Sequence, residues 1–170
     1  VNEFAVGAVT DTNAAANTVA EDATIGTAVG ITGFASDADA TTNTISYTLD
    51  DNASGKFAIN SVTGVVTVAG TLDYETATSH IITVRATSAD GSFSTQAFTI
   101  NVTDVNEFAV TAPNDTKPAV NQVNENAANG TTVGITASAS DADATNNGVT
   151  YSLFNNDGGR FAINAATGVV

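Results

Sequence analysis

The sequence predicts an all-β protein made of tandem immunoglobulin-like Greek-key β-sandwiches, the second of them truncated. Three observations lead to this fold class. The chain repeats itself at one constant offset. Short segments alternate apolar and polar residues, and turn residues separate them about every ten positions. Val, Ile and Thr are abundant, and no long Leu/Glu/Lys-rich helical stretch is present.

The repeat is read directly from two motifs. VNEFAV at Val1–Val6 recurs at Val105–Val110, and GITGFASDADAT at Gly30–Thr41 recurs as GITASASDADAT at Gly134–Thr145. Both give an offset of about 104 residues. About 40 of the 66 aligned positions are identical. A period of one domain length predicts an array of domains rather than a solenoid of small units.

The offset predicts a complete repeat over residues 1–104 and a partial repeat over residues 105–170. Val170 stands opposite Val66, so the second repeat lacks a counterpart of residues 67–104. A repeat without these strands would leave sheet edges unpaired. We therefore expect the parent protein to continue, or the chain to be a cut or engineered fragment.

Alternating apolar positions predict six strands in the complete repeat, with a further edge strand within Phe4–Val19. The six are Thr27–Ala35, Thr44–Leu49, Phe57–Asn60, Val65–Ala69, His80–Thr87 and Ser94–Thr103. About seven strands in about 100 residues are typical of an immunoglobulin-like sandwich.

The period of two also predicts which side chains face the core. They are Val29, Ile31, Ile45, Tyr47, Leu49, Phe57, Ile59, Val66, Val68, Ile82, Val84, Ala86, Phe98, Ile100 and Val102. Leu72 is expected to close one end of the core. The stretch Asn60–Gly64 is expected to form a hairpin turn, with Gly64 at positive φ.

The charge excludes several classes of partner. Four basic residues face 18 acidic ones, for a formal net charge of −14. Such a chain repels nucleic acid and anionic membrane surfaces and attracts cations. No apolar run is long enough to span a membrane, so no membrane insertion is expected. There is no Cys, which rules out disulfides and thiolate metal sites.

The acidic residues gather in short clusters at the predicted strand ends. The clusters contain Glu21, Asp37 with Asp39, Asp73 with Glu75, and Asp104 with Glu107, and the second repeat copies two of them in Glu125 and in Asp141 with Asp143. Loops of a Greek-key sandwich meet at two poles, so clusters from separate loops can converge. Ca²⁺ takes six to eight oxygen ligands, which such clusters supply.

The order of these motifs resembles the cadherin repeat family over Val1–Asp104 and the partial second copy. The matching motifs are the acidic position at Glu21, the D-x-D at Asp37–Asp39, Leu72–Glu75 and the linker Asp104–Glu107, with Ala86–Asp90 between the last two. The resemblance implies about three Ca²⁺ ions at each junction between repeats.

By that resemblance, one complete junction site is expected in this chain. Its ligands would be Glu21, Asp73, Glu75, Asp104, Val105, Asn106, Glu107, Phe108, Asp141, Asp143 and a downstream Asn, either Asn146 or Asn147. Val105 and Phe108 belong to the linker, whose carbonyls help to complete the shell, and Asp104 either ligates or fixes the linker turn. A weaker N-terminal half-site would hold Asn2, Asp37, Asp39, Asn43 and Asp90.

The chain departs from the family pattern in two places. The linker has Glu107 and Phe108 where the family has Asp and Asn, which lengthens one bridging ligand. The counterpart of Asp90 in the second repeat would lie beyond Val170. The ion nearest the second repeat is therefore expected to be weakly held or absent.

Catalysis is not expected. The only His, His80, lies at a predicted strand start, where a structural or surface role is expected. Asp73 and Glu75 are too close in sequence for a glycosidase pair, and the chain has no Trp to form a sugar platform. No D-x-D is followed by the Gly and Glu of an EF-hand loop.

The predicted function is that of a Ca²⁺-rigidified spacer in a cell-surface adhesin, which projects a terminal ligand-binding region. The Cys-free, Ala/Thr/Asn/Asp-rich composition and the high internal identity resemble the extender arrays of large bacterial RTX-type adhesins of the outer surface. The expected partners are neighbouring repeats of the same chain. The alternative function is Ca²⁺-dependent binding of polysaccharide or of another cadherin-like domain.

Overall fold

The computed structural model describes residues 4–170, which form an all-β structure without helices. It therefore contains no helix that could cross a membrane. The chain divides into two compact units, Val1–Val105 and Asn106–Val170. Each unit is described by itself.

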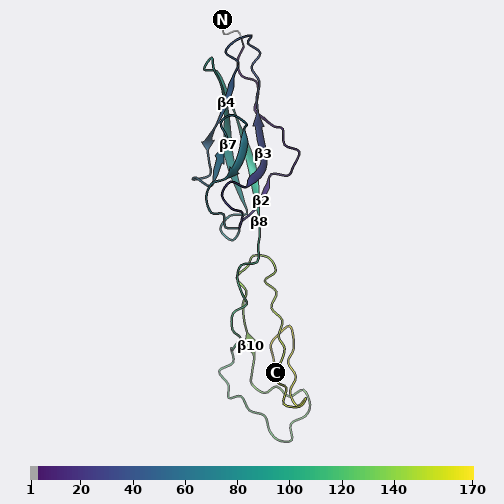
Figure 1. Cartoon of the computed structure of the whole chain (residues 1–170). Helices are drawn as coiled ribbons and strands as arrows, with labels where there is room; N and C mark the ends of the chain where they lie inside the picture. Colours follow the sequence, from purple (N-terminus) through teal and green to yellow (C-terminus); the bar gives the residue numbers. More distant parts are fainter. Residues whose placement is uncertain (1–3) are drawn as a thin grey trace. The chain divides into compact units, whose positions relative to one another are not determined.

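The first unit is a sandwich of two four-stranded sheets (Figure 1). One sheet has the order β1-β3-β6-β5, from Thr10–Asp11, Ala28–Phe34, Val65–Val68 and Phe57–Ile59. The other has the order β2-β8-β7-β4, from Thr18–Ala20, Phe93–Thr103, Ser79–Ser88 and Ile45–Asp51. The expected fold class, an all-β sandwich, is confirmed.

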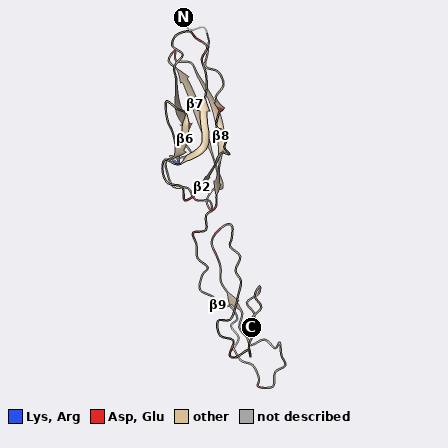
Figure 2. Ribbon diagram, turned by 45° about the vertical axis from the view of Figure 1, so that its right-hand side comes forward, with Lys and Arg blue, Asp and Glu red and all other residues tan. Residues whose placement is uncertain are grey.

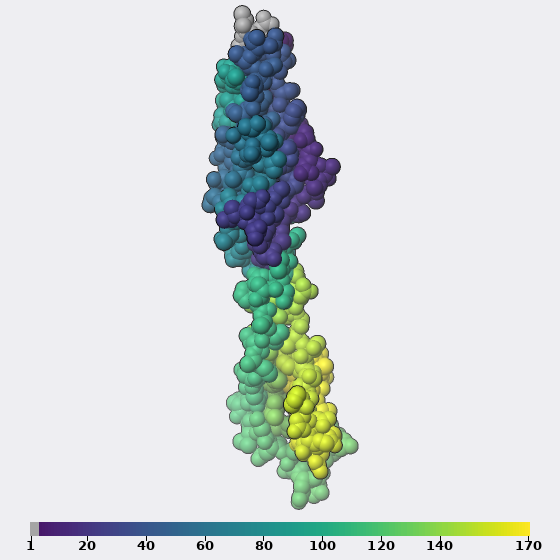
Figure 3. All heavy atoms as spheres, viewed as in Figure 1, coloured from purple at the N-terminus to yellow at the C-terminus, as the bar shows by residue number. Residues whose placement is uncertain are grey.

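The N-terminal edge differs from the prediction because two short strands replace the single one expected. β1 pairs antiparallel with β3, whereas β2 pairs parallel with β8 in the opposite sheet. This segment, purple in Figure 3, lies on the surface of the unit. Asp11 stabilises the crossing, which is the segment that passes from β1 in one sheet to β2 in the other. Its Oδ1 accepts hydrogen bonds from the Asn13 and Thr32 amides at 2.9 Å each. The chain thereby contributes an edge strand to each sheet.

The core lies between the two sheets and contains most of the predicted inward positions. Four of them are only partly buried and pack against it, namely Ile45, Leu49, Ile59 and Phe98. Ile82, Val84 and Ala86 of β7 are fully buried, and Phe57 is 2% exposed. Leu72 is buried with them, as expected. Val6, Val9, Val19 and Ala35 also belong to the core but were not predicted. The first three come from the N-terminal segment, whose alternation is too short to reveal a face.

The predicted turn at Asn60–Gly64 is confirmed. Gly64 has φ +71°, and its N–H donates to the Asn60 carbonyl at 2.9 Å. The Asn60 side chain accepts hydrogen bonds from the Val62 and Thr63 amides. The turn delivers β6 back onto β5, with Ile59 opposite Val66.

The second unit repeats local interactions of the first. Its named strands are short, β9 (Asn114–Asp115) and β10 (Ala137–Ser138), and they pair antiparallel. The Tyr151 hydroxyl accepts a hydrogen bond from the Ala139 amide at 3.0 Å, as Tyr47 does from Ala35 at 3.2 Å. Sequence identity between the repeats therefore preserves individual hydrogen bonds.

His80 packs its ring against Phe57, with the ring centroids 5.8 Å apart. Its Nε2 is buried and has no hydrogen-bond partner among residues 4–170. Burial lowers the pKa of His80, and the nearby charge of Lys56 lowers it further. The role of His80 is therefore structural.

We expect stability to fall as pH drops from about 7.5 to about 5.5, partly because of His80. Its folded-state pKa lies below the unfolded value, so the unfolded chain binds more protons in this window and is favoured by acid. A His80→Phe variant should lose less stability over the same range, measured by denaturant unfolding at each pH. Equal losses in both proteins would contradict the assignment.

Candidate metal centre

Two groups of carboxylates form in the first unit, and both lie on loops rather than strands (Figure 2). One group contains Asp37, Asp39 and Asp90, and the other contains Glu21, Glu75 and Asp104. Within each group, one oxygen per residue lies within 4.8 Å of the others. Asp90 precedes β8 and Asp104 follows it, so the two groups lie at opposite ends of this strand.

The first group is held by the loops after β3 and between β7 and β8. Asp37 Oδ1 accepts a hydrogen bond from the Asp39 amide at 3.1 Å, which folds the D-x-D segment back on itself. Asp90 Oδ1 accepts one from the Ser92 amide at 2.6 Å. A hydrogen bond with the Ser88 side chain holds the pKa of Asp37 below its usual value. The loop after β3 therefore favours the ionised form of Asp37.

The chemistry of this group fits a hard cation. The Oδ2 atoms of Asp37 and Asp90 are buried and have no hydrogen-bond partner within residues 4–170. Buried carboxylate oxygens need a hydrogen-bond donor or a cation to compensate for lost hydration. Asn43 lies at the same loop, where its Nδ2 donates to the Asp39 carbonyl at 3.0 Å. Asn2, predicted for the same half-site, lies outside the described residues.

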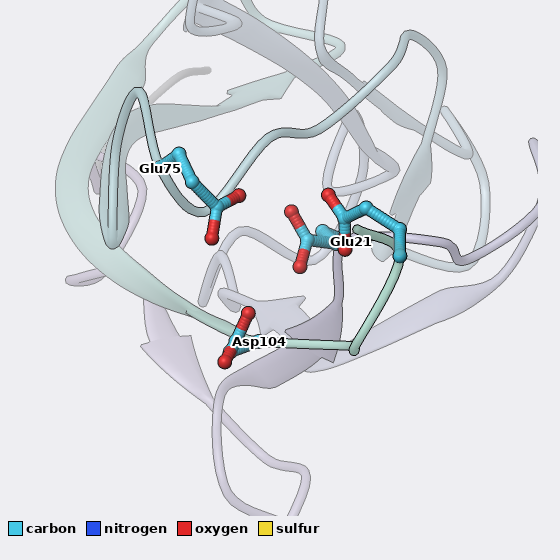
Figure 4. A group of neighbouring side chains, drawn as sticks. Glu21, Glu75 and Asp104 are labelled. Atoms are coloured by element: carbon cyan, nitrogen blue, oxygen red, sulfur yellow. The ribbon is translucent and has the colours of Figure 1, made fainter. Parts of the chain in front are cut away.

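The second group converges at the end of the unit where β8 leaves the sandwich. The carboxylates of Glu21, Glu75 and Asp104 point into a common space (Figure 4). Glu21 is only 8% exposed, Asp104 is half-buried and Glu75 is exposed. All three side chains offer the oxygen ligands that Ca²⁺ prefers.

Glu21 joins two segments of the first unit. Its Oε2 accepts a hydrogen bond from the Tyr74 amide at 2.6 Å, and its Oε1 accepts one from the Val105 amide at 2.8 Å. The carboxylate thereby connects the Leu72–Glu75 loop to the residue that follows Asp104. Val105, predicted to contribute its carbonyl, is positioned here through its amide.

Glu21→Gln should be destabilising in saturating Ca²⁺. The new amide group can accept only one of the two backbone hydrogen bonds and turns its own N–H donors toward the other. We expect the free energy of unfolding to fall by roughly 1–3 kcal/mol, measured by urea denaturation. The neighbouring Asp22 is exposed, so Asp22→Asn removes the same charge and should change it by less than about 0.5 kcal/mol. Equal effects would contradict the role of Glu21.

Asp73 does not belong to either group within the described residues. Its two oxygens accept hydrogen bonds from Thr76, one from the amide and one from the hydroxyl, both at 2.8 Å. The hydroxyl bond, followed by the amide bond, lowers the pKa of Asp73. Asp73 therefore closes the turn before β7, and its role as a metal ligand stays a prediction.

In the second unit, Asp143 organises the linker residues. It is 2% exposed, and it accepts hydrogen bonds from Asn106 Nδ2 at 2.7 Å and from the Glu107 and Phe108 amides at 3.0 and 3.2 Å. Burial by itself raises the pKa of Asp143, but these backbone hydrogen bonds outweigh it and the pKa is lowered. Asp143 is therefore kept as a carboxylate.

The remaining predicted ligands of this unit lie around the same loop. Asp141 Oδ1 accepts a hydrogen bond from the Asp143 amide at 3.3 Å, as Asp37 does from Asp39. Asn147 Nδ2 donates to the Ala144 carbonyl at 3.4 Å, and Asn146 has φ +56°. The D-x-D loop thus takes a similar local form in both repeats.

One residue of the site was not predicted. Ser88 is 4% exposed, and its hydroxyl donates to the Thr42 carbonyl at 2.8 Å. It binds the end of β7 to the loop that carries the first acidic group. A Ser at a strand end carries no distinctive signal, although the Ala86–Asp90 motif that contains it was singled out.

The profile of the Cadherin domain family matches residues 16–103. Protocadherin Fat 4 of Mus musculus is 40% identical over 161 residues, which is 90% of this chain and 3% of that protein. The Protocadherin-like wing polarity protein stan of Drosophila melanogaster is 39% identical over 128 residues, 70% of this chain and 4% of that protein. The chain thus spans a few per cent of the length of these relatives.

Solved structures agree with these sequence matches. Mouse Cadherin-23 EC22-24 superimposes with a TM-score of 0.75 at 32% identity, covering 99% of this chain and 54% of that one. Human CDH23 EC21-23 gives a TM-score of 0.72 at 28% identity with the same coverage. With its sandwich fold, its acidic groups and these matches, the chain belongs to the cadherin domain family.

Proposed function

We propose that this chain is a Ca²⁺-rigidified spacer from the extracellular part of an adhesion protein. Cadherin domains are extracellular adhesion modules rather than enzymes, they occur as tandem repeats, and they generally bind Ca²⁺. The observation that carries the proposal is the group Glu21, Glu75 and Asp104 at the end of the first unit where the linker starts. Bound Ca²⁺ would be coordinated by the oxygens of these carboxylates and would neutralise their charge.

The order of the residues along the chain supports a Ca²⁺ site at the junction between the repeats. Asp104 is followed directly by the linker residues Asn106 and Glu107, and Asp143 holds those residues in the second unit. Without a cation, carboxylates from both repeats and the linker would repel one another. Ca²⁺ would bind the state in which the linker is ordered. Binding would therefore stabilise a fixed junction. The proposed ligands remain the set that the resemblance to the cadherin repeat family implies.

Small-angle scattering tests the proposal. We expect the profile in millimolar Ca²⁺ to describe one fixed arrangement of the two units, and the profile in chelator to describe many. Glu75→Gln is the variant that tests the proposed ligands. Because the Glu75 side chain is exposed, removing its charge should not unfold the first unit. Identical profiles with Ca²⁺ and chelator would contradict the spacer function.

The cellular setting proposed is the surface of a bacterium, in an RTX-type adhesin. Its support is compositional: no Cys, four basic residues and many Ala, Thr and Asn. The animal relatives do not add to this support. Further copies of the repeat in the flanking sequence of the parent gene, together with a bacterial source, are the expected finding.

Homophilic recognition is the second candidate function, because cadherin domains mediate such contacts. The sheet β2-β8-β7-β4 exposes two large apolar side chains, Ile81 at 59% and Phe93 at 55%. Sedimentation analysis over a concentration series in Ca²⁺ would detect self-association. A pure spacer should stay monomeric and should not bind polysaccharide in a pull-down.

A further inference from the structure

The D-x-D loop of the second unit ends in an Asn–Gly dipeptide, Asn147–Gly148. We propose that Asn147 is a site of spontaneous deamidation, at which the side-chain amide is converted to a carboxylate without an enzyme. The inference is independent of calcium binding, because it depends only on the covalent neighbour of Asn147 and on the local backbone.

The reaction is an intramolecular acyl transfer followed by hydrolysis. The Gly148 nitrogen loses its proton to solvent base and attacks Cγ of Asn147. A new N–Cγ bond forms, the bond from Cγ to Nδ2 breaks, and ammonia leaves after taking a proton. Water then opens the cyclic imide at either carbonyl, which yields Asp or isoaspartate. No oxidation or reduction takes place, and water is the only co-reactant.

The local structure allows this attack. Asn147 and Gly148 are exposed and belong to no strand. The Gly148 N–H makes no hydrogen bond to residues 4–170. A Cβ placed on Gly148 would meet nothing within 4 Å, so the surroundings leave this backbone room to move. The single side-chain restraint on Asn147 among these residues is the 3.4 Å hydrogen bond to Ala144.

The first repeat supplies an internal comparison. At the same position of its D-x-D loop stands Asn43, which is followed by Thr44 rather than Gly. The β-branched Thr crowds the attacking nitrogen and restricts the backbone. Asn43 is also held more firmly, with Nδ2 3.0 Å from the Asp39 carbonyl, and Thr44 accepts a hydrogen bond from the Ala89 amide at 3.0 Å. Asn43 should therefore be stable where Asn147 reacts.

A second Asn–Gly dipeptide, Asn129–Gly130, lies in a closed turn. The Thr131 amide donates to the Ala128 carbonyl at 3.0 Å across it, and Gly130 has φ +86°. This hydrogen bond restrains the rotation that brings the Gly nitrogen to the Asn side chain. Asn129 is thus expected to react more slowly than Asn147.

Deamidation would also change the loop electrostatically. It places a new carboxylate four positions after Asp143, in a chain that already carries a net charge of −14. If the proposed junction site exists, the change converts one candidate ligand from an amide oxygen to a carboxylate. That consequence rests on the proposed function, whereas the reaction itself does not.

The test is ageing of the full chain in chelator at mildly alkaline pH and body temperature, followed by peptide mapping with mass spectrometry. We expect Asn147 to deamidate at least roughly tenfold faster than Asn43, because only Gly148 lacks a Cβ. Gly148→Ala, which meets no neighbouring atom, should abolish the difference. Thr44→Gly should transfer the reactivity to Asn43.

Circular dichroism of each variant before ageing confirms that the fold is retained, so that changes in rate report on the local chemistry. Equal rates at Asn147 and Asn43 in the wild-type chain would overturn the inference. So would an unchanged rate at Asn147 in the Gly148→Ala variant. A failure of Ca²⁺ to bind in a separate calorimetric titration would remove the proposed function but leave the deamidation result intact.

Discussion

Addition of about 10 mM Ca²⁺ to the chelated protein should raise the thermal midpoint of the first unit by roughly 10–20 °C. Extracellular sites of this kind bind with dissociation constants of about 10⁻⁴ M, so the cation would be in roughly hundredfold excess. One such site adds about 2.7 kcal/mol to the free energy of unfolding. Each kcal/mol raises the midpoint of a domain of this size by about 4–8 °C. Differential scanning calorimetry measures the shift.

Two variants separate specific binding from general screening of charge. Glu75→Gln removes an exposed member of the second acidic group and should reduce the shift substantially. Asp22→Asn removes the same charge outside both groups and should leave the shift unchanged. An equal shift in the two variants, or the same shift with Mg²⁺ as with Ca²⁺, would argue against a built Ca²⁺ site.

Gly64→Ala should destabilise the first unit by roughly 2–5 kcal/mol. Gly64 has φ +71°, a conformation that costs an L-residue about 1–2 kcal/mol. In addition, a Cβ on Gly64 would lie 2.1 Å from the Gly33 carbonyl oxygen. The Gly33 N–H is bonded to the Gly64 carbonyl at 2.9 Å, so β3 cannot move aside without breaking this hydrogen bond. Urea denaturation measures the loss.

Gly55→Ala is the matched control for this prediction. Gly55 has φ +85°, but a Cβ there would meet nothing within 4 Å. Its cost should therefore be only the conformational one, about 1–2 kcal/mol. If the two variants lose the same stability, the close approach of Gly64 to Gly33 does not constrain the turn.

The sandwich could be predicted because its inward face follows a local rule. Alternation in the sequence identified Ile82, Val84 and Ala86, which are fully buried in the structure. The turn at Asn60–Gly64 was predictable for a similar reason, since Gly tolerates positive φ. The two-sheet crossing at Asp11 was not predicted. It depends on hydrogen bonds to Thr32, which is distant in sequence.

For the candidate site, the sequence determined the kind of ligand and the spacing within each motif. Carboxylates in short clusters, repeated at a constant offset, already pointed to a hard cation. Which clusters meet was implied only by the family resemblance, and within the first unit the tertiary structure decided it. It gathers Asp90 with Asp37 and Asp39, and Glu75 with Glu21 and Asp104, while Thr76 occupies both oxygens of Asp73. Spacing along one segment governs local geometry, whereas convergence depends on how separate loops end at the poles of the sandwich.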